Sequence, residues 1–321
     1  MRRGLVIGKF MPLHLGHIAL IRYAALRCDE LIVSMSFTPS DPIDASLRFS
    51  WIIQTFTDDP KIKPAMVEDN FDDESLPLAE RTRIWASFIQ RVYPPVDRVF
   101  SSEEYGLPLA RHLGAEHFMF DSRRNQIPVS ASKIRHSPLR YWEFIPQPAK
   151  PYFVKKICFY GPESTGKSSM TVRMADLYNT TFVPEVAREM LITNDFSVDD
   201  IVRIGTSQYE RIQQNVKSAN KFLMCDTDAI TTQIYSQYYL GTVPPVLYEL
   251  EKKVSYAHYF LFDIDVPWVG DGLRDLGHLR SEMFSVFKKA LDDRNIDYTF
   301  VTGHWHQREA IVRATLDKLL V

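Results

Sequence analysis

The stretch VKKICFYGPESTGKSSMTVRMADLY, residues 154–178, decides the fold of the second half of the chain. Its first part ends in an apolar run typical of a buried strand, and its last twelve residues carry apolar positions at helical spacing. Between them, residues 161–168 (GPESTGKS) fit the phosphate-loop pattern G-x-x-x-x-G-K-[ST]. Because the motif requires a strand before it and a helix after it, the sequence predicts a nucleotide site here.

The residue types in this loop match the chemistry of a bound triphosphate. Backbone amides would cradle the phosphates, Lys167 would reach the β- and γ-phosphates, and the Ser168 hydroxyl would hold Mg²⁺. We therefore assign a catalytic role to Lys167 and a metal-binding role to Ser168. Nucleotide binding is assigned to the following residues: Gly161, Glu163, Ser164, Thr165, Gly166, Ser168 and Ser169.

Carboxylates near later strand ends are the candidate partners of the loop. Asp226 ends the apolar run of residues 222–226 and is predicted to bind the metal and act in catalysis. Asp228 is assigned to the substrate, with a helix N-cap as its alternative. Glu185 is a candidate catalytic base, and Arg188 would bind substrate or form an exposed salt bridge. Residue types alone do not decide which of the three carboxylates is the base.

The stretch DIDVPWVGDGLRDLGHLR, residues 263–280, has the glycines, proline and arginines of a mobile lid. We expect Arg274 and Arg280 to fold over the transferring phosphoryl group, and Trp268 to contact the substrate. After the last predicted strand, Arg308 is a candidate adenine contact, and an ordinary helix-start arginine is the equal alternative.

A second constellation lies at the start of the chain, where the apolar run of residues 4–10 predicts a strand and HLGH, residues 14–17, opens a helix. A helix N-terminus supplies unpaired amides and partial positive charge, and Gly16 lets a phosphate approach the backbone. His14 and His17 could donate hydrogen bonds to a phosphate that gains negative charge. Ordinary turn and cap residues are the alternative reading.

Short apolar runs alternate with amphipathic stretches along both halves, which predicts an α/β fold with two doubly wound parallel sheets. Three prolines in residues 145–151 (IPQPAKP) predict a short, stiff linker. The expected domains are therefore residues 1–145 and 152–321. The acidic run of residues 68–75 is expected to be a solvated loop.

Length and charge bound the function. The 321 residues suggest about two domains, and 38 basic against 40 acidic side chains exclude the strong field of a polyanion-binding protein. Three widely spaced cysteines in apolar surroundings predict buried thiols. Neither a signal peptide nor an apolar stretch long enough to cross a membrane is evident, so a cytoplasmic protein is expected.

The sequence GKFMPLHLGH, residues 8–17, resembles the start of the nucleotidyltransferase superfamily that includes the nicotinamide mononucleotide (NMN) adenylyltransferases. VSASKIR, residues 129–135, resembles its second signature, which holds the ATP triphosphate at a helix start, with Ser132 in the usual threonine position. The resemblance implies that Trp85 stacks on nicotinamide. With the motif chemistry, it assigns catalysis to His14, His17 and Arg135, and ATP binding to the following residues: Gly8, Lys9, Phe10, Gly16, Ser130 and Ser132.

Both signatures in this order resemble the NadR-type proteins, which join an NMN adenylyltransferase to a ribosylnicotinamide kinase. The resemblance implies that the C-terminal domain phosphorylates nicotinamide riboside to NMN with ATP and Mg²⁺. The N-terminal domain would then transfer AMP from ATP to NMN, giving NAD and pyrophosphate. Because the first strand begins at Gly4, we expect no helix-turn-helix domain and no DNA binding; homo-oligomerisation is left open.

Two alternatives belong to other classes. One domain could be a sensor that binds NAD or ATP without turnover, and the Ser132 departure is the sequence hint for it. Both domains could instead act on a different nucleoside and a different phosphate. Product formation from nicotinamide riboside, NMN and ATP separates these readings.

Overall fold

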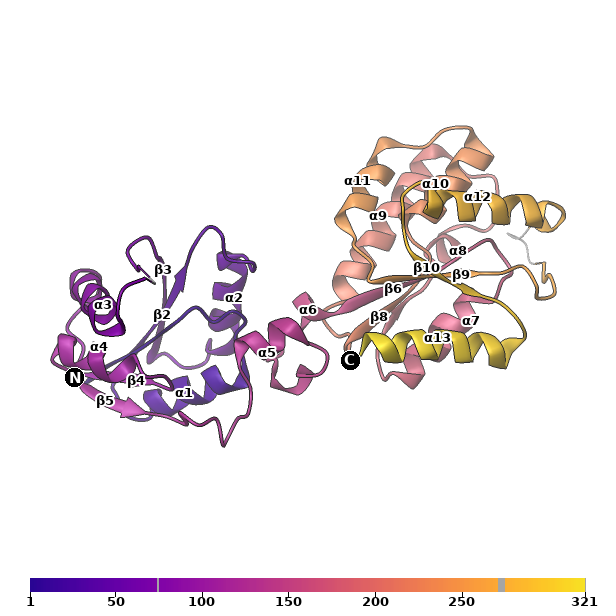
Figure 1. The fold of residues 1–321 in the computed structure, drawn as a ribbon. Coiled ribbons are helices and arrows are strands. Elements are labelled where there is room, and N and C mark those ends of the chain that lie inside the picture. The colour runs from indigo at the N-terminus through magenta and orange to yellow at the C-terminus, as the bar shows by residue number, and fades with distance from the viewer. Residues whose placement is uncertain (74, 271–274, 321) are drawn as a thin grey trace. The chain divides into compact units, whose positions relative to one another are not determined.

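The chain folds into two compact units, Met1–Lys150 and Pro151–Val321, and the boundary falls inside the proline-rich stretch of residues 145–151. The structure, a computed structural model, describes residues 1–73, 75–270 and 275–320. Each unit is an α/β domain with its own five-stranded parallel sheet (Figure 1).

The N-terminal unit has the strand order β3-β2-β1-β4-β5. Its strands are β1 (Arg3–Gly8), β2 (Glu30–Phe37), β3 (Ile62–Glu68), β4 (Arg98–Ser101) and β5 (Glu116–Met119). Its helices are α1 (Leu15–Ala25), α2 (Ala45–Thr55), α3 (Leu78–Val92), α4 (Gly106–Leu113), α5 (Ala131–His136) and the 3₁₀ turn η1 (Trp142–Phe144). Because β1 pairs with both β2 and β4, the strand order reverses there, and open α/β sheets bind ligands outside the carboxyl ends of the strands at such a point.

Apolar side chains on both faces of β1 explain its central place. Leu5 and Val6 are fully buried, and Leu5 packs with Ile32 against Ile89 of α3 and Leu109 of α4. Helices α1 and α2 lie on the other side of the sheet (Figure 1). The carboxyl end of β1 is thereby fixed by packing from both faces.

The C-terminal unit has the strand order β10-β9-β6-β8-β7. Its strands are β6 (Lys155–Tyr160), β7 (Phe182–Val183), β8 (Phe222–Asp226), β9 (His258–Phe262) and β10 (Tyr298–Val301). Its helices are α7 (Lys167–Leu177), α8 (Ala187–Met190), α9 (Val198–Asn215), α10 (Ala229–Leu240), α11 (Pro245–Lys253), the 3₁₀ turn η2 (Leu276–Leu279), α12 (Arg280–Asp292) and α13 (Trp305–Leu319), while the short α6 (Lys150–Phe153) spans the unit boundary.

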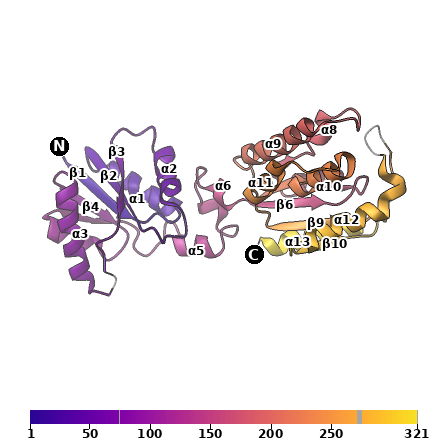
Figure 2. The same ribbon diagram turned by 90° about the horizontal axis from the view of Figure 1, so that it is seen from above.

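The central strands of this second sheet are buried on both faces. Phe159, Leu223 and Phe260 are fully buried in β6, β8 and β9, as expected for the near-continuous apolar runs of a parallel sheet. Helices α9 to α12 lie on one side of the sheet and α7 and α13 on the other (Figure 1), and α10 and α11 lie close to β6 in the view from above (Figure 2). The phosphate loop therefore leaves the middle strand of a rigid layer.

The predicted α/β fold with two parallel sheets is confirmed. Strand β3 and helices α4, α9 and α11 were not predicted. Cys28, Cys158 and Cys225 are buried and free, as expected. None of the helices formed by the described residues is long and apolar enough to cross a membrane.

Candidate active sites

His14 caps the helix that follows β1. Its Nδ1 accepts hydrogen bonds from the backbone amides of Gly16 (3.1 Å) and His17 (3.3 Å), so Nδ1 is unprotonated and the ring proton sits on Nε2. The two imidazoles stack with their centroids 3.6 Å apart, and Phe10 meets His17 edge-on. The cap reading of His14 is therefore correct, and it leaves Nε2–H as a donor.

Both histidines are neutral at pH 7. Burial, followed by the charge of Arg124, lowers the pKa of His14 to about 4. Burial lowers the pKa of His17 well below its usual value, and His14 and Arg124 add to this effect. Nδ1 of His17 is buried and has no hydrogen-bond partner among the described residues. The pair can thus act as neutral hydrogen-bonding groups, while positive charge comes from arginine and lysine side chains nearby.

A cleft of about 1090 Å³ opens beside these histidines. Of the predicted residues, it is lined by Gly8, Lys9, Phe10, His14, Gly16, His17 and Arg135. Arg124 also lines this cleft and was not singled out from the sequence, although it lies only five residues before the second signature, which begins at Val129. It forms an ion pair with Glu103 at 3.6 Å.

The second signature brings Arg135, but not its serines, to this cleft. The Arg135 guanidinium donates to the backbone oxygen of Met11 and to Ser132 Oγ, the latter at 3.4 Å. Ser130 is the N-cap of α5 and accepts from the amide of Lys133. Neither serine lines the cleft: the Ser130 hydroxyl caps α5, and the Ser132 hydroxyl accepts from Arg135.

A second cleft, of about 840 Å³, lies on the other side of the end of β1 and contains Trp85. The Trp85 ring meets Tyr105 edge-on, and the Arg81 guanidinium lies 5.3 Å from its centre. Arg81 forms a two-fold ion pair with Asp72 at 2.9 and 2.5 Å, which lowers the pKa of Asp72. Residues 69–73 form a loop of exposed and half-buried side chains, as expected for this acidic run, and Asp72 in this loop also lines the cleft.

The phosphate loop has the backbone shape that its glycines require. Gly161 and Gly166 have φ angles of +137° and +85°, and a Cβ on Gly161 would lie 3.0 Å from the backbone oxygen of Phe262. Lys167 Nζ donates to the Pro162 oxygen at 2.7 Å, and Thr165 Oγ1 donates to the same oxygen at 2.9 Å. Burial lowers the pKa of Lys167, and the carboxylates of Glu185 and Asp226 oppose this effect.

Asp226 fits a magnesium ligand. It is 2% exposed at the end of β8, and its Oδ1 has no hydrogen-bond partner among the described residues. Burial, and then Glu185, raises its pKa to about 6, while Lys167 and a hydrogen bond with Ser168 act in the opposite direction. A buried carboxylate oxygen without a partner next to a serine hydroxyl suits an ion that takes its remaining ligands from phosphate and water.

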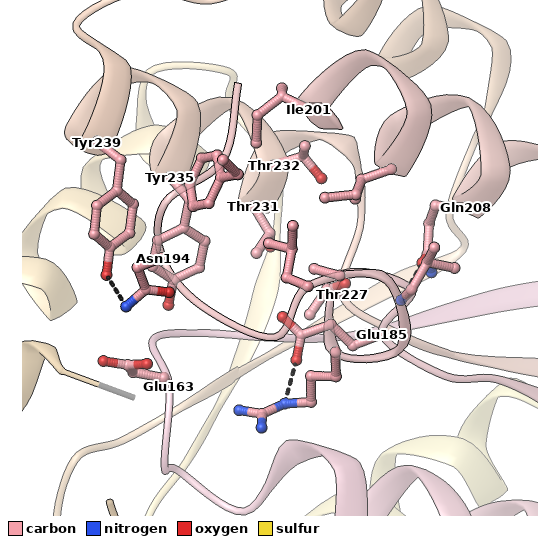
Figure 3. Close-up of a pocket in the computed structure, with 16 residues that line it drawn as sticks. Glu163, Glu185, Asn194, Ile201, Gln208, Thr227, Thr231, Thr232, Tyr235 and Tyr239 are labelled. Atoms are coloured by element: carbon pink, nitrogen blue, oxygen red, sulfur yellow. Dashed lines mark hydrogen bonds and ion pairs between the residues drawn. The ribbon is translucent and has the colours of Figure 1, made fainter. Parts of the chain in front are cut away.

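A third cleft, of about 710 Å³, adjoins the phosphate loop (Figure 3). The predicted residues Glu163, Glu185 and Arg188 line it, and Glu185 pairs with Arg188 at 2.9 Å. Asn194, Tyr235 and Tyr239 line it as well and were missed, because nothing in the sequence pattern separates them from ordinary helix and loop residues. Tyr239 donates to Asp275 Oδ1 at 2.5 Å and accepts from Asn194 at 3.4 Å.

The structure places Asp228 at a helix start, away from the third cleft to which its predicted substrate role would assign it. Asp228 is the N-cap of α10: its Oδ1 accepts from the amide and hydroxyl of Thr231, and its Oδ2 accepts from the hydroxyl of Tyr259. Burial raises its pKa to about 6. Because it is enclosed by these donors and does not line the third cleft, the N-cap alternative holds.

The lid residues are placed differently from the expectation. Arg280 donates to the backbone oxygens of Val266 (2.6 Å) and Ser164 (3.1 Å), so it holds the phosphate loop instead of projecting over it. Trp268 packs on Gly277 and near the Arg280 guanidinium, and it does not line the third cleft. Arg274 lies outside the described residues.

Arg308 is also placed differently. It is 2% exposed, and its guanidinium donates to the backbone oxygens of Gly303 (2.7 Å), Thr165 (2.7 Å) and Asp263 (3.0 Å) and pairs with Asp265. A side chain enclosed in this way is a poor candidate for an adenine contact.

These features define a class of protein: a nucleotide-handling enzyme with a paired-histidine nucleotidyltransferase unit and a phosphate-loop kinase unit. A family model described as an AAA domain matches residues 156–308. The chain is 33% identical over 93% of its length to the trifunctional NAD biosynthesis/regulator protein NadR of Escherichia coli, covering 78% of that protein. It is 28% identical over 49% of its length to a nicotinamide-nucleotide adenylyltransferase of Thermococcus onnurineus, covering 83% of it.

The solved structures agree in fold. A crystal structure of NadR protein in complex with NR superposes with a TM-score of 0.81 at 22% identity, covering 99% of this chain and 96% of the other. A NadR complex with NAD and AMP-PNP gives a TM-score of 0.80 at 23% identity, covering 100% and 97%. The chain belongs to the NadR family, as its motifs predicted.

Proposed function

We propose that this chain catalyses two consecutive steps of NAD synthesis. The C-terminal unit phosphorylates nicotinamide riboside to NMN with ATP, and the N-terminal unit transfers AMP from ATP to NMN, giving NAD and pyrophosphate. The observation that carries the proposal is that each sheet presents a phosphate-binding loop with an adjoining cleft, in the order that the NadR relatives share.

In the kinase step, the 5′-hydroxyl oxygen of the nucleoside attacks the γ-phosphorus of ATP, and ADP leaves as the old phosphorus–oxygen bond breaks. Glu185 lines the nucleoside cleft and accepts the hydroxyl proton, while Lys167 neutralises charge on the phosphates. Ser168 and Asp226 would hold Mg²⁺, which supplies charge neutralisation at the phosphates when bound. Tyr235 and Tyr239 give the cleft the aromatic surface that suits a base.

In the adenylyl transfer, a phosphate oxygen of NMN attacks the α-phosphorus of ATP and pyrophosphate leaves. The nucleophile is already anionic, so the step needs positioning and charge neutralisation more than a base. His14 and His17 act as neutral hydrogen-bonding groups, and Lys9, Arg124 and Arg135 supply positive charge at the ATP cleft. Trp85 receives the nicotinamide ring in the second cleft.

We propose that residues 1–145 form the adenylyltransferase domain and residues 152–321 the kinase domain. We also place the protein in the cytoplasm. Three cysteines without a disulfide, and two reactions that consume ATP, support this location.

The proposal is tested by incubating the full chain with nicotinamide riboside, ATP and Mg²⁺ and following the products over time. We expect NMN to form first and NAD to follow, with one ADP and one pyrophosphate released per NAD. If the wild-type chain binds NMN and ATP without releasing pyrophosphate, the N-terminal unit is a sensor. If a nucleoside panel is phosphorylated but nicotinamide riboside is not, the assigned substrate is wrong.

A further inference from the structure

Arg308 lies at the first turn of α13, yet it contacts the phosphate loop more than 140 positions earlier in the chain. We infer that Arg308 is a positioning residue of the kinase unit, which orients the phosphate loop for nucleotide binding without contacting the nucleotide. This inference rests on the proposed function, because the loop is taken to bind the ATP of the phosphoryl transfer. Its test requires only that the loop binds nucleotide.

Arg308 orients the peptide group between Thr165 and Gly166. The Arg308 guanidinium holds the backbone oxygen of Thr165 at 2.7 Å. In a planar trans peptide, the oxygen of one residue and the amide hydrogen of the next point in opposite directions. Fixing the Thr165 oxygen toward Arg308 therefore turns the Gly166 N–H away from Arg308, leaving it to face an anion.

The neighbouring peptide is held in the same manner. Arg280 donates to the backbone oxygen of Ser164 at 3.1 Å, which directs the amide of Thr165 in the opposite sense. Two consecutive oxygens of the loop thus point to cations outside it. A phosphate loop binds through its amides, so oxygens that are kept outward remove the dipoles that would repel the anion.

Arg308 is itself held in place by residues that follow two strands. It pairs with Asp265 and donates to the backbone oxygens of Gly303 and Asp263, which follow β10 and β9. Asp265 also accepts from the Gly303 amide and, at 2.7 Å, from the Thr302 hydroxyl. The loop is in this way tied to two strand ends of the sheet, so its shape is set before nucleotide arrives.

An arginine fits this position. The side chain is 2% exposed, and a planar guanidinium offers five fixed donors that can reach several oxygens at once. The carboxylate of Asp265 balances its buried charge. A loop that is already ordered loses less conformational freedom on binding, so the affinity for nucleotide should fall when Arg308 is replaced.

Hydrogen exchange with mass spectrometry of the full chain tests this, because it reports each loop separately. The probe is β,γ-imido-ATP with Mg²⁺, and the readout is the nucleotide concentration that half-protects a peptide covering residues 156–168. We expect Arg308→Gln to raise this concentration about ten- to a hundredfold, the range for a lost hydrogen bond to a charged group. The nucleotide concentration that half-protects residues 5–17 in the same samples should be the same for Arg308→Gln and for wild type.

Arg294→Gln is the matched control. Arg294 is a partly buried arginine of the same unit that pairs with Glu251 at 2.7 Å and bonds Gln233, both outside the loop. We expect it to lower thermal stability while leaving the half-protection concentration within twofold of wild type.

If Arg308→Gln also lowers only the stability and keeps the wild-type half-protection concentration, Arg308 is a structural anchor and the inference is wrong. If Arg308→Gln does not fold, Arg308→Lys decides: it keeps the charge but has one donor group in place of the fork. We expect at least a threefold rise for it, and a wild-type value overturns the inference. Failure of the wild-type chain to phosphorylate nicotinamide riboside would contradict the proposed function and leave this titration readable.

Discussion

Both loops are assigned to phosphate anions, but the N-terminal loop offers neutral imidazole groups and the C-terminal loop offers a lysine. The N-terminal loop places the buried His14 and the partly buried His17 at a helix start, and burial lowers the pKa of both, that of His14 to about 4, so both rings are neutral. The C-terminal loop buries a lysine, Lys167, against the carboxylates of Asp226 and Glu185. A neutral donor costs little to bury, whereas a buried lysine needs opposite charge close by. The histidine loop therefore needs no carboxylate beside its rings, whereas the lysine loop keeps two carboxylates close to its ammonium group.

The loops are alike in how their backbones are held. Arg48 is fully buried, donates to the backbone oxygens of Lys9 (2.6 Å) and Ile43 (3.0 Å), and pairs with Asp41 at 2.7 Å. Arg308 holds the C-terminal loop through the same kind of bond, with Asp265 as its counter-ion. Unrelated motifs thus share one device, a buried arginine–aspartate pair behind the loop.

Removing one cationic or imidazole group from each loop should have the largest effect on activity and tests whether the two loops act separately. We expect Lys167→Ala to lower phosphorylation of nicotinamide riboside at least about a hundredfold, since a charge that stabilises the transferring phosphates is lost. His17→Ala should lower adenylyl transfer to NMN on the same order. Separate assays of ADP and pyrophosphate release measure the two reactions.

Each variant is its own control, because the untouched reaction should stay near the wild-type rate. A variant that remains folded and loses both reactions would contradict the model of two independent sites.

Asp226→Asn should separate activity from stability. We expect kinase activity to fall about a hundredfold or more, because the metal loses a ligand. The free energy of unfolding of the C-terminal unit should rise by up to about 3 kcal/mol at pH 8, because burial and Glu185 raise the pKa of this carboxyl to about 6 from an unfolded value of 3.8. The folded wild-type unit binds more protons between these values, so the gain should shrink as pH falls through 6 toward 4.

Urea unfolding at several pH values, with hydrogen exchange of β6 and β8 identifying the unit, measures this effect. A stability gain that does not depend on pH would show that the carboxylate charge is not its cause.

His14 predicts the opposite pH dependence for the N-terminal unit. Its folded pKa of about 4 lies below the unfolded value of 6.5, so the folded unit binds fewer protons in this interval. Stability is therefore present above pH 6.5 and is lost as pH falls toward 4, by up to about 3 kcal/mol. Protonation at Nδ1 also removes the acceptor that caps α1.

His14→Asn keeps a side-chain acceptor for the cap and cannot titrate, so we expect its unfolding free energy to depend less on pH in this range. His14→Ala should lose about 1 kcal/mol of capping at neutral pH as well. Equal acid sensitivity of His14→Asn and wild type would assign the loss to other groups.

The smallest expected effect concerns base recognition. Trp85→Ala should raise the KM for NMN about tenfold with kcat within about threefold, because a stacking surface is lost while the phosphate groups stay in place. Trp85→Phe keeps an aromatic ring and should stay close to wild type. Initial rates at varied NMN and fixed ATP measure both constants, and an unchanged KM for Trp85→Ala would remove Trp85 from the site.

The fold could be predicted where the pattern was local. Residues 30–37 (ELIVSMSF) are mostly apolar with β-branched Ile32 and Val33, a pattern that predicts a strand, and they form β2 over Glu30–Phe37. Strand β3 escaped prediction because it contains Pro64 and alternates weakly, and it forms by pairing with β2 along its whole length. The partners of β3 come from tertiary structure, which a local pattern does not contain.

The candidate sites could be predicted where a motif fixes the backbone. Lys167 and His14 sit at the helix starts that their spacing implies. Arg280 and one of the two readings of Arg308 were expected at a ligand, but both side chains donate to backbone oxygens, because a long side chain after a strand can turn either way. Tyr239 of α10 and Asn194 of the loop before α9 are brought to one cleft by tertiary packing, which no spacing rule encodes.

The end of β1 also brings the two clefts of the N-terminal unit together. The two clefts of the N-terminal unit adjoin each other there, because they share five lining residues: Ile7, Gly8, Lys9, Glu103 and Tyr105. Both molecules can then be seated at the same time, and the adenylyl group can pass directly from one to the other with no covalent enzyme intermediate. With ATP and NMN placed in these clefts as proposed, we expect initial rates that follow a ternary-complex mechanism.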